Sequence, residues 1–317
     1  MVKYLGLAFL TALFTCFLSA WFTLEKNPEA LFWKGAVDQK LEHLDQLDRE
    51  KPVVFFVGGS SCAFSVDPGI LEEEFGLQSV NLGLHAGSGR ALQTELALRN
   101  MRKGDLLVLA YETNFWQARR PFQQSPLGSQ IYYSLGDRLA GPSEIEKLGI
   151  DPLWKMTDVR PGGRLLLSLL SKKLLGRKPY RYEQSDVSEG GLIQYSQGLI
   201  KAEPSRQVAE VPPSEAALTF LRNLVNYAKE REWQVVVTLP WQFVREEKLH
   251  DLREANTGLR NEIDKIALVL PDQAEGAQSD PSLFSDTLWH LTGKGSGMRT
   301  RRVGVALSSI IQSSDNP

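Results

Sequence analysis

Apolar residues along the chain fall into short continuous runs, separated by stretches with helical spacing. The runs lie at residues 53–57, 80–82, 106–111, 235–239 and 266–270. Runs that are apolar on both faces are typical of central parallel strands, so we predict five strands there. The stretches with helical spacing predict helices at Pro68–Phe75, Arg90–Met101, Ser214–Trp233 and from about Lys294 to Ile311. This alternation predicts an open α/β sheet covered by helices on both faces.

The longest apolar segment of the chain lies at its N-terminus, at residues 4–22. It contains no charged residue and follows Lys3. As a helix it would reach roughly 28 Å, close to the ~30 Å hydrocarbon core of a bilayer. We therefore predict a single transmembrane anchor over residues 1–24, with a cleaved signal peptide or a buried helix of a soluble protein as alternatives. With Lys3 in a short tail, we expect the body on the extracytoplasmic side.

Composition adds little to this picture. The chain has 317 residues, of which 42% are hydrophobic and 23% charged, and its net charge is -2. These values are typical of a soluble globular domain and give no reason to expect nucleic acid as a partner. The two cysteines, Cys16 and Cys62, are not expected to form a disulfide, because Cys16 lies in the apolar N-terminal segment.

Two segments do not fit the alternation of strands and helices. Residues 25–51 are polar and charged, and we predict a stalk or a first helix leading away from the membrane there, ahead of one α/β domain at 52–317. Within that domain, residues 117–210 are rich in Gly, Pro, Ser and Tyr and predict an irregular insertion over one end of the sheet. Part of it, 160–181, holds seven basic residues and no acidic one. This part indicates either a docking surface for an anionic polymer or lipid headgroups, or an amphipathic helix with a solvated basic face.

Small and polar residues follow the predicted strands, at the edge where open α/β sheets bind ligands. Residues 58–61 read Gly-Gly-Ser-Ser, residues 81–89 form a glycine-rich loop, and residues 112–114 read Glu-Thr-Asn. Near the C-terminus, Asp286 precedes His290 by four positions. A hydroxyl, a glycine-rich loop, an amide and an acid beside a histidine are the parts that acyl transfer through serine requires.

The order of these blocks resembles the SGNH (GDSL-type) hydrolase superfamily. The resemblance is carried by VGGSSCAFSVDP, VNLGLHAGSG and FSDTLWHLTGKGSGMRT, together with the N-terminal anchor. It implies a flavodoxin-like sheet. The chain is similar to the membrane-anchored, envelope-facing branch of that superfamily, which includes the alginate O-acetylation proteins and the DltD-type proteins of teichoic-acid D-alanylation. This implies a serine esterase (hydrolase) or O-acyltransferase acting on a cell-surface polysaccharide, tethered to the bacterial cytoplasmic membrane with its body in the periplasm.

The resemblance also implies a role for each site residue. Ser60 matches the nucleophile, His290 the general base and Asp286 the acid that orients it. The oxyanion hole would use the Ser60 N–H together with further donors from Gly87, Gly83 and Asn114. The spacing from Asn81 favours Gly87 over Gly83.

Three features depart from the family pattern. Gly59 stands where the family has Asp, and the block around Asn114 lacks the family's glycine and following Asp. The late motif reads Asp-x-x-x-His instead of Asp-x-x-His. Both spacings would place Asp286 and His290 on one side of a helical turn.

Several site residues have alternative roles. Ser61 is the second candidate nucleophile. Asp286 could instead cap the turn before Trp289. His85 could line a substrate pocket, and Glu112 could orient a hydroxyl or fix its loop.

Two other functions remain open at this point. One is a non-catalytic glycan-binding or assembly component that keeps the fold, and the other is a soluble lipase-like enzyme whose N-terminus has been cleaved. No Cys or His spacing indicates zinc, so we expect no metal or cofactor. The expected partners are an acylated glycan or another acyl-ester substrate, and the cytoplasmic membrane through residues 4–22. An integral-membrane acyl donor protein is a further candidate partner, and nucleic acid is not expected.

Overall fold

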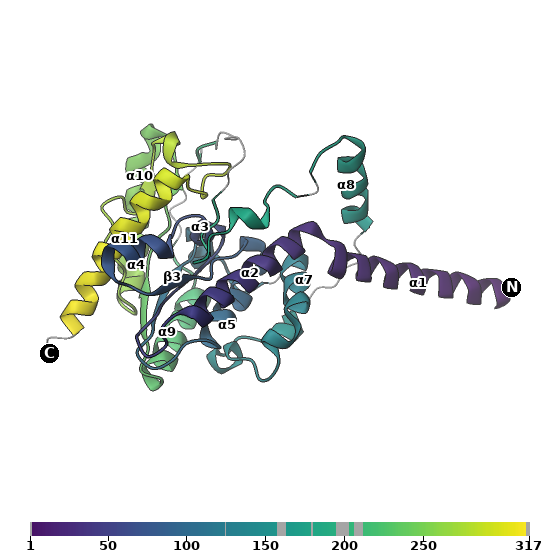
Figure 1. Ribbon diagram of the computed structural model, residues 1–317, viewed down its shortest axis with the longest axis horizontal. Helices are drawn as coiled ribbons and strands as arrows, with labels where there is room; N and C mark the ends of the chain where they lie inside the picture. The colour runs from purple at the N-terminus through teal and green to yellow at the C-terminus, as the bar shows by residue number, and fades with distance from the viewer. Residues whose placement is uncertain are drawn as a thin grey trace.

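A parallel four-stranded sheet lies at the centre of the computed structural model (Figure 1). The model describes residues 2–123, 125–156, 163–178, 180–194, 203–205 and 212–314. The strands, in spatial order, are β2 (Ser79–Asn81), β1 (Val54–Gly58), β3 (Leu106–Ala110) and β4 (Gln234–Val237). The fifth predicted run, 266–270, is reduced to a parallel bridge between Val269 and Val237 at the β4 edge. With this bridge the order is that of the flavodoxin-like sheet, so the predicted fold class is confirmed.

Helices cover both faces of this sheet. One face packs against α2 (Pro28–Gln46), α5 (Arg90–Leu98), α7 (Pro126–Leu135), α9 (Glu215–Glu230) and α10 (Leu249–Asp264). The other face packs against α4 (Pro68–Phe75) and α11 (Gly293–Ser314). The remaining helices are α1 (Val2–Lys26), α3 (Ser60–Ala63), α6 (Thr113–Gln117) and α8 (Gly163–Leu174). A second, two-stranded sheet pairs β5 (Gln242–Phe243) with β6 (Ala277–Gln278). The four predicted helices after residue 67 are all present, within a few residues at each end.

The central strands are apolar throughout because both of their faces are buried. In β1, Phe55 and Val57 belong to the core under α2 and α5, while Val54 and Phe56 belong to the core under α4 and α11. Side chains alternate between the two faces of a strand, so a sheet covered on both sides needs apolar residues at every position. The end of such a run marks the edge where the strand leaves the core.

Of the two alternatives for residues 25–51, the helix is present over most of the segment and the stalk is not. Residues 28–46 form α2, which lies against the sheet and buries Phe32, Trp33, Val37 and Leu41. Its apolar residues recur every three or four positions, as expected for an amphipathic helix, although its overall composition is polar. The α/β domain therefore begins at α2, directly after α1.

Lys40 on the buried face of α2 joins three backbone segments. Its ammonium group is fully buried and donates hydrogen bonds to the carbonyl oxygens of Asn81 (2.6 Å), Gly83 (2.9 Å) and Gly191 (2.7 Å). These residues belong to the end of β2, the glycine-rich loop and the insertion, respectively. Three carbonyl acceptors thus satisfy all three protons of the ammonium group.

Most of the described insertion consists of short helices, and part of it belongs to the main core. α7 packs against α2, and its Ile131 and Leu135 are buried there. α8 lies further out, and Figure 1 shows it above the end of α1 that enters the domain. Arg160 of the basic stretch lies outside the described residues.

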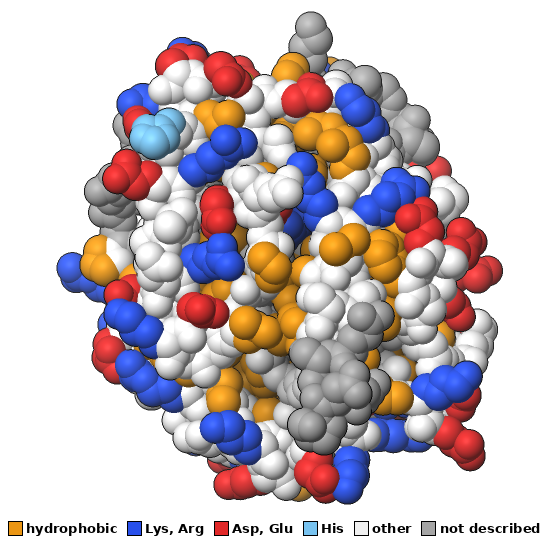
Figure 2. Space-filling model, turned by 90° about the vertical axis from the view of Figure 1, so that its left-hand side faces the viewer, with side chains coloured by type: hydrophobic (Ala, Val, Ile, Leu, Met, Phe, Trp, Pro, Cys, Tyr) orange, Lys and Arg blue, Asp and Glu red, His pale blue; other side chains and the backbone are white. Residues whose placement is uncertain are grey.

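One helix in the described part of the chain is long and apolar enough to cross a membrane. This stretch of α1, Lys3–Phe22, is not buried by the rest of the structure. α1 projects from one side of the body, away from the sheet (Figure 1). The face on the opposite side carries acidic and basic side chains next to one another (Figure 2). Cys16 on α1 is exposed, Cys62 is buried, and neither forms a disulfide.

We predict that Lys40→Met lowers the free energy of unfolding by at least about 2 kcal/mol, because it leaves buried carbonyl groups without a donor. The melting temperature should fall by several degrees. The matched control is Lys34→Met on the same helix, where the lysine pairs with Asp38 at the surface. Equal effects of the two substitutions on thermal unfolding would show that the hydrogen bonds of Lys40 stabilise the fold no more than a surface ion pair does.

The same lysine predicts a pH dependence. Burial lowers the pKa of Lys40 to about 7, whereas the ordinary value is 10.5. Between these values the unfolded chain holds a proton that the folded chain has released, so the stability of the wild type relative to Lys40→Met should rise with pH in this window. That gain is lost as the pH falls through about 7. The measurement is the melting temperature of both proteins across this pH range. A difference between them that does not change with pH would contradict the lowered pKa of Lys40.

Candidate active site

The three sequence blocks that follow β1, β2 and β3 meet at the carboxyl edge of the sheet. Asn81, the last residue of β2, donates from its side-chain amide to the carbonyl oxygens of Cys62 (3.0 Å) and Val66 (2.8 Å). Its side-chain oxygen accepts the N–H of Gly83 at 2.9 Å. A Cβ on Gly83 would overlap the backbone of Ala63 at the end of α3, so only glycine allows this approach. The glycine-rich loop is therefore fixed against the turn that carries Ser60.

Asp286 and His290 form a buried hydrogen-bonded pair. His290 Nδ1 lies 2.8 Å from Asp286 Oδ1, and the side chains are 8% and 0% exposed. The pair is held in a tight loop between the bridge partners Phe284 and Leu291, and not on one side of a helical turn as the spacing suggested. The Thr287 hydroxyl, and not Asp286, accepts the backbone N–H groups of the turn.

The electrostatics of this pair keep Asp286 ionised. Burial raises its pKa, but hydrogen bonds from His290, Tyr182 and Arg181 outweigh burial and bring the pKa well below its ordinary value. The Tyr182 hydroxyl donates to Asp286 Oδ2 at 2.8 Å, and Arg181 forms an ion pair with the same oxygen. An ionised carboxylate on Nδ1 holds the imidazole in the tautomer whose Nε2 can accept a proton.

His290 lies against the turn that carries Ser60. Its ring stacks on Phe64 with centroids 4.0 Å apart and an interplanar angle of 4°. The Phe64 N–H in turn donates to the Ser60 carbonyl oxygen at 3.0 Å. No hydrogen bond joins the Ser60 hydroxyl to His290 among the described contacts, and such contacts often form only with substrate.

The two serines of the turn have different surroundings. Ser61 is fully buried, and its hydroxyl donates to Glu112 Oε1 at 2.9 Å. The Ser60 hydroxyl makes no hydrogen bond within the described part of the chain. Because Ser60 is the first residue of α3, its N–H has no acceptor within the helix. Of the two roles suggested for Glu112, it therefore has the first: it orients a hydroxyl, and that hydroxyl belongs to Ser61.

Glu112 also explains why position 59 is a glycine. A Cβ on Gly59 would overlap the Glu112 carboxylate, so a larger residue there would displace it. Arg90 neutralises this carboxylate from the other side, with Nη2 3.5 Å from Glu112 Oε2. The carboxylate therefore occupies the space that a side chain at position 59 would need.

The predicted oxyanion-hole donors differ in what they already bind. The Gly83 N–H donates to Asn81, and the Gly87 N–H donates to His85 Nδ1 at 2.9 Å. Either amide would have to exchange this partner for a substrate oxygen. Asn114 is exposed at the start of α6, and its side-chain oxygen accepts from Arg90 Nη2 at 3.2 Å. Because this bond uses only the side-chain oxygen, the side-chain NH₂ group of Asn114 can still donate to a substrate.

His85 lies in the same region as His290. Burial lowers its pKa, and a proton gained by His290 would lower it further. Its ring is 5.8 Å from that of Trp33 on α2. The imidazole is therefore held neutral beside the candidate base, where it could line a substrate site as the sequence suggested.

Comparisons with known proteins place few constraints on this site. No protein-family model and no curated protein matches the chain. Among solved structures, the chain is similar to one described as a lipolytic protein of the G-D-S-L family from Desulfitobacterium hafniense DCB-2. The TM-score is 0.36 at 11% identity, over 81% of this chain and 99% of that one. The similarity is slight, so the function is inferred below from this chain's own residues.

Sequence reasoning missed the partners of Asp286. Arg181 and Tyr182 lie more than a hundred positions before Asp286, inside the insertion, and no local pattern connects them to it. Arg90 was missed for a different reason. It begins a helix, where a basic residue is ordinarily a solvated side chain, yet here it contacts both Glu112 and Asn114.

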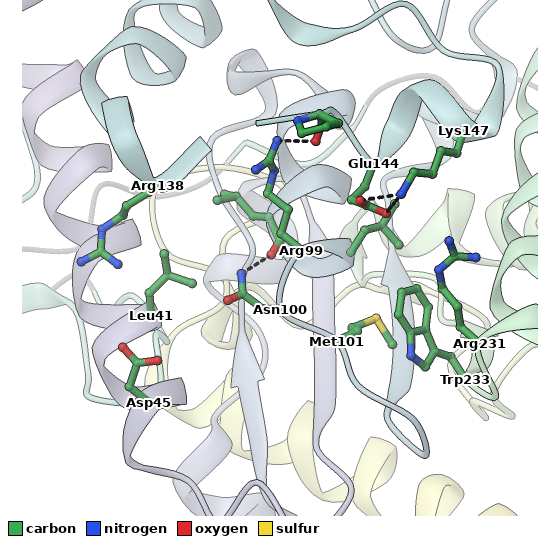
Figure 3. Close-up of a pocket in the computed structure, with 13 residues that line it drawn as sticks. Leu41, Asp45, Arg99, Asn100, Met101, Arg138, Glu144, Lys147, Arg231 and Trp233 are labelled. Atoms are coloured by element: carbon green, nitrogen blue, oxygen red, sulfur yellow. Dashed lines mark hydrogen bonds and ion pairs between the residues drawn. The ribbon is translucent and has the colours of Figure 1, made fainter. Parts of the chain in front are cut away.

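A separate pocket of about 650 Å³ lies at the opposite edge of the sheet (Figure 3). Its residues precede the strands: Met101 comes before β3, and Trp233 comes directly before β4. Two basic residues of this pocket have acidic partners. Arg99 pairs with Glu95 at 2.6 Å, and Lys147 pairs with Glu144. This pocket is therefore remote from the Asp286–His290 pair, and these two charges are balanced within the protein.

We predict that Asp286→Asn reduces the rate of serine labelling by a fluorophosphonate on the order of 10⁴-fold, because the wrong imidazole tautomer would face the serine. Tyr182→Phe removes only one donor to the carboxylate, about 1 kcal/mol, and should reduce the rate roughly tenfold or less. Equal losses in the two variants would contradict the assignment of Asp286 as the orienting acid.

We also predict that Gly59→Ala lowers the free energy of unfolding by about 1–3 kcal/mol, because its methyl group would displace the Glu112 carboxylate. The matched control is Gly258→Ala in α10, where nothing lies near the added carbon. That control should gain up to about 1 kcal/mol from helix propensity. Chemical denaturation of both variants measures the difference, and an unchanged Gly59→Ala protein would rule out the overlap.

Proposed function

We propose that this chain is a serine acyl-ester hydrolase or O-acyltransferase of the SGNH type. Ser60 is the nucleophile, His290 the general base and Asp286 the acid that orients it. The observation that carries this proposal is the buried Asp286–His290 pair, stacked on Phe64 of the turn that holds Ser60. A buried, ionised carboxylate on one nitrogen of an imidazole is costly unless the pair is used or well satisfied, and such pairs concentrate at functional sites.

The first half of the reaction forms an acyl-enzyme. Ser60 Oγ attacks the acyl carbonyl carbon while its proton moves to His290 Nε2. The carbonyl π electrons move to the oxygen, where the Ser60 N–H and the Asn114 amide would donate to it, each contributing about 2.7–4 kcal/mol. The ester C–O bond then breaks, and the leaving alkoxide takes the proton from His290.

The second half depends on the acceptor. A water molecule or a sugar hydroxyl gives its proton to His290 and attacks the acyl carbon, and Ser60 recovers the proton as it leaves. Water gives an esterase and a sugar hydroxyl gives an O-acyltransferase, with the same residues in the same roles. We propose an acylated cell-surface glycan as substrate, in keeping with the resemblance to the alginate O-acetylation and DltD-type proteins. An integral-membrane acyl donor protein would supply the acyl group for transfer.

We further propose that α1 anchors the chain in the bacterial cytoplasmic membrane, with the body on the periplasmic side. The support is its uncharged stretch of spanning length, left unburied by the domain, with Lys3 on its N-terminal side. This location would place the site near glycans of the cell envelope.

The decisive experiment is labelling of the 317-residue chain in detergent with a fluorophosphonate, with the adduct located by mass spectrometry. The adduct should lie on Ser60, persist in Ser61→Ala and vanish in Ser60→Ala and His290→Ala. An adduct on Ser61 that survives Ser60→Ala would assign the nucleophile to the neighbouring serine. No adduct in folded protein would contradict the serine-enzyme proposal.

A non-catalytic glycan-binding component is the second candidate function. It is favoured by one observation: the Gly83 and Gly87 amides both donate within the protein and leave fewer donors for an oxyanion. Under this alternative, the folded chain would bind an acetylated glycan in titration calorimetry without releasing acetate. Release of acetate by the wild type and not by Ser60→Ala would exclude it.

A further inference from the structure

We propose that α8 lies on the surface of the membrane that α1 spans, with its leucine face in the lipid and the exposed Lys173 and Arg177 at anionic headgroups. This inference rests on the membrane anchor of the proposed function. It assigns to the domain a second attachment to the same membrane leaflet, one that the anchor alone does not provide.

The outer face of α8 is apolar and uncovered. Leu167 is 68% exposed and Leu174 is 87% exposed, and the exposed Leu166 and Leu170 lie on the same side of the helix. Leu175 directly after the helix is 62% exposed. Large aliphatic side chains gathered on one helical face in this way are typical of helices that lie in the membrane interface.

Charge shows which way this face points. The positive charge of Lys172 lowers the pKa of Glu29, partly opposing the effect of burial, so Lys172 lies near the start of α2. On a helix with 3.6 residues per turn, Lys172 is roughly opposite Leu167 and Leu174. With Lys172 toward the domain, the leucines point away from it.

The placement of α8 relative to α1 fits a membrane plane. In Figure 1, the axis of α8 runs across the direction of α1, at the level where α1 joins α2. A bilayer spanned by α1 would have its surface near this junction, because the apolar stretch ends at Phe22 and Pro28 begins α2. α8 therefore lies parallel to that surface and at its height.

The charges around α8 complement an anionic membrane. Lys173 and Arg177 are exposed basic residues, and no acidic residue lies between them. Lys172 faces the domain near Glu29, and Lys178 forms an ion pair with Glu183. Basic residues close to an anionic membrane surface are attracted to it. The face of the molecule on the side away from α1 instead mixes both signs of charge (Figure 2). The stretch whose charges are all positive therefore lies on the side of the molecule from which α1 projects.

This attachment would also act on the candidate site. Arg181 and Tyr182, which hold the Asp286 carboxylate, follow within eight residues of the end of α8. Seating α8 on the membrane would hold this segment, and with it the partners of Asp286, at a fixed height above the lipid.

The test uses the 317-residue chain in vesicles of phosphatidylcholine and phosphatidylglycerol. A single NBD fluorophore is attached to a cysteine that replaces Leu167, in a Cys16→Ser, Cys62→Ala background. Two matched positions serve as controls: Leu10 within α1, and Val305 on α11, which is 63% exposed on the side away from the membrane. Nitroxide-labelled lipids quench the fluorophore only where it reaches the bilayer.

We expect quenching at position 167 at least roughly threefold stronger than at position 305, and reduced in vesicles of phosphatidylcholine alone. Quenching at Leu10 but not at Leu167 would overturn this inference and leave the anchor in place. Quenching at neither would overturn both, while leaving the Ser60 labelling result unaffected. A response at position 167 to a soluble anionic polysaccharide, with none to lipid, would assign the surface to an anionic polymer and overturn the membrane contact.

Discussion

The buried ammonium group of Lys40 joins the parts of the molecule on which the candidate site depends. It bonds three carbonyl groups, from the end of β2, the glycine-rich loop and the insertion, and no carboxylate in the described part of the chain pairs with it. Burying a charge in this way is tolerated because every proton has an acceptor. Since Lys40 belongs to α2, which follows α1 directly, the same bonds connect the start of the domain next to α1 to the edge of the sheet where Ser60 lies.

At that edge, two buried carboxylates each hold a different group of the candidate site. Glu112, balanced by Arg90, takes the hydroxyl of Ser61 and fills the space beside Gly59. Asp286, supported by Tyr182, takes Nδ1 of the imidazole. Ser60 is left as the hydroxyl of the turn that no group of the described chain engages. Under the proposed function, Ser60 is therefore the nucleophile, because the hydroxyl of the neighbouring Ser61 is already bound to Glu112.

The sequence predicted the features that depend on local patterns. β1 and β3 were found because strands buried on both faces are apolar at every position, and α4 because its residues have helical spacing. In the structure Asp67 caps the start of α4 and Gly76 ends it. The proximity of Asp286 and His290 followed from their spacing, although the loop that holds them is not helical. The packing of α2 against the sheet was missed because its buried face includes Lys40, which counts as polar in any composition. Tyr182 was missed because its contact with Asp286 forms across a long insertion, which no local pattern records.

The central claim is that Ser60 carries the acyl group during the reaction, and trapping this intermediate tests it most directly. The 317-residue chain would be mixed briefly with an activated acetyl ester, quenched in acid and mapped by mass spectrometry. The account predicts an acetyl group on Ser60 that builds up rapidly in the wild type, decays with time and is absent from His290→Ala. Ester turnover without acetylated Ser60, or equal acetylation of Ser60 in His290→Ala, would contradict it.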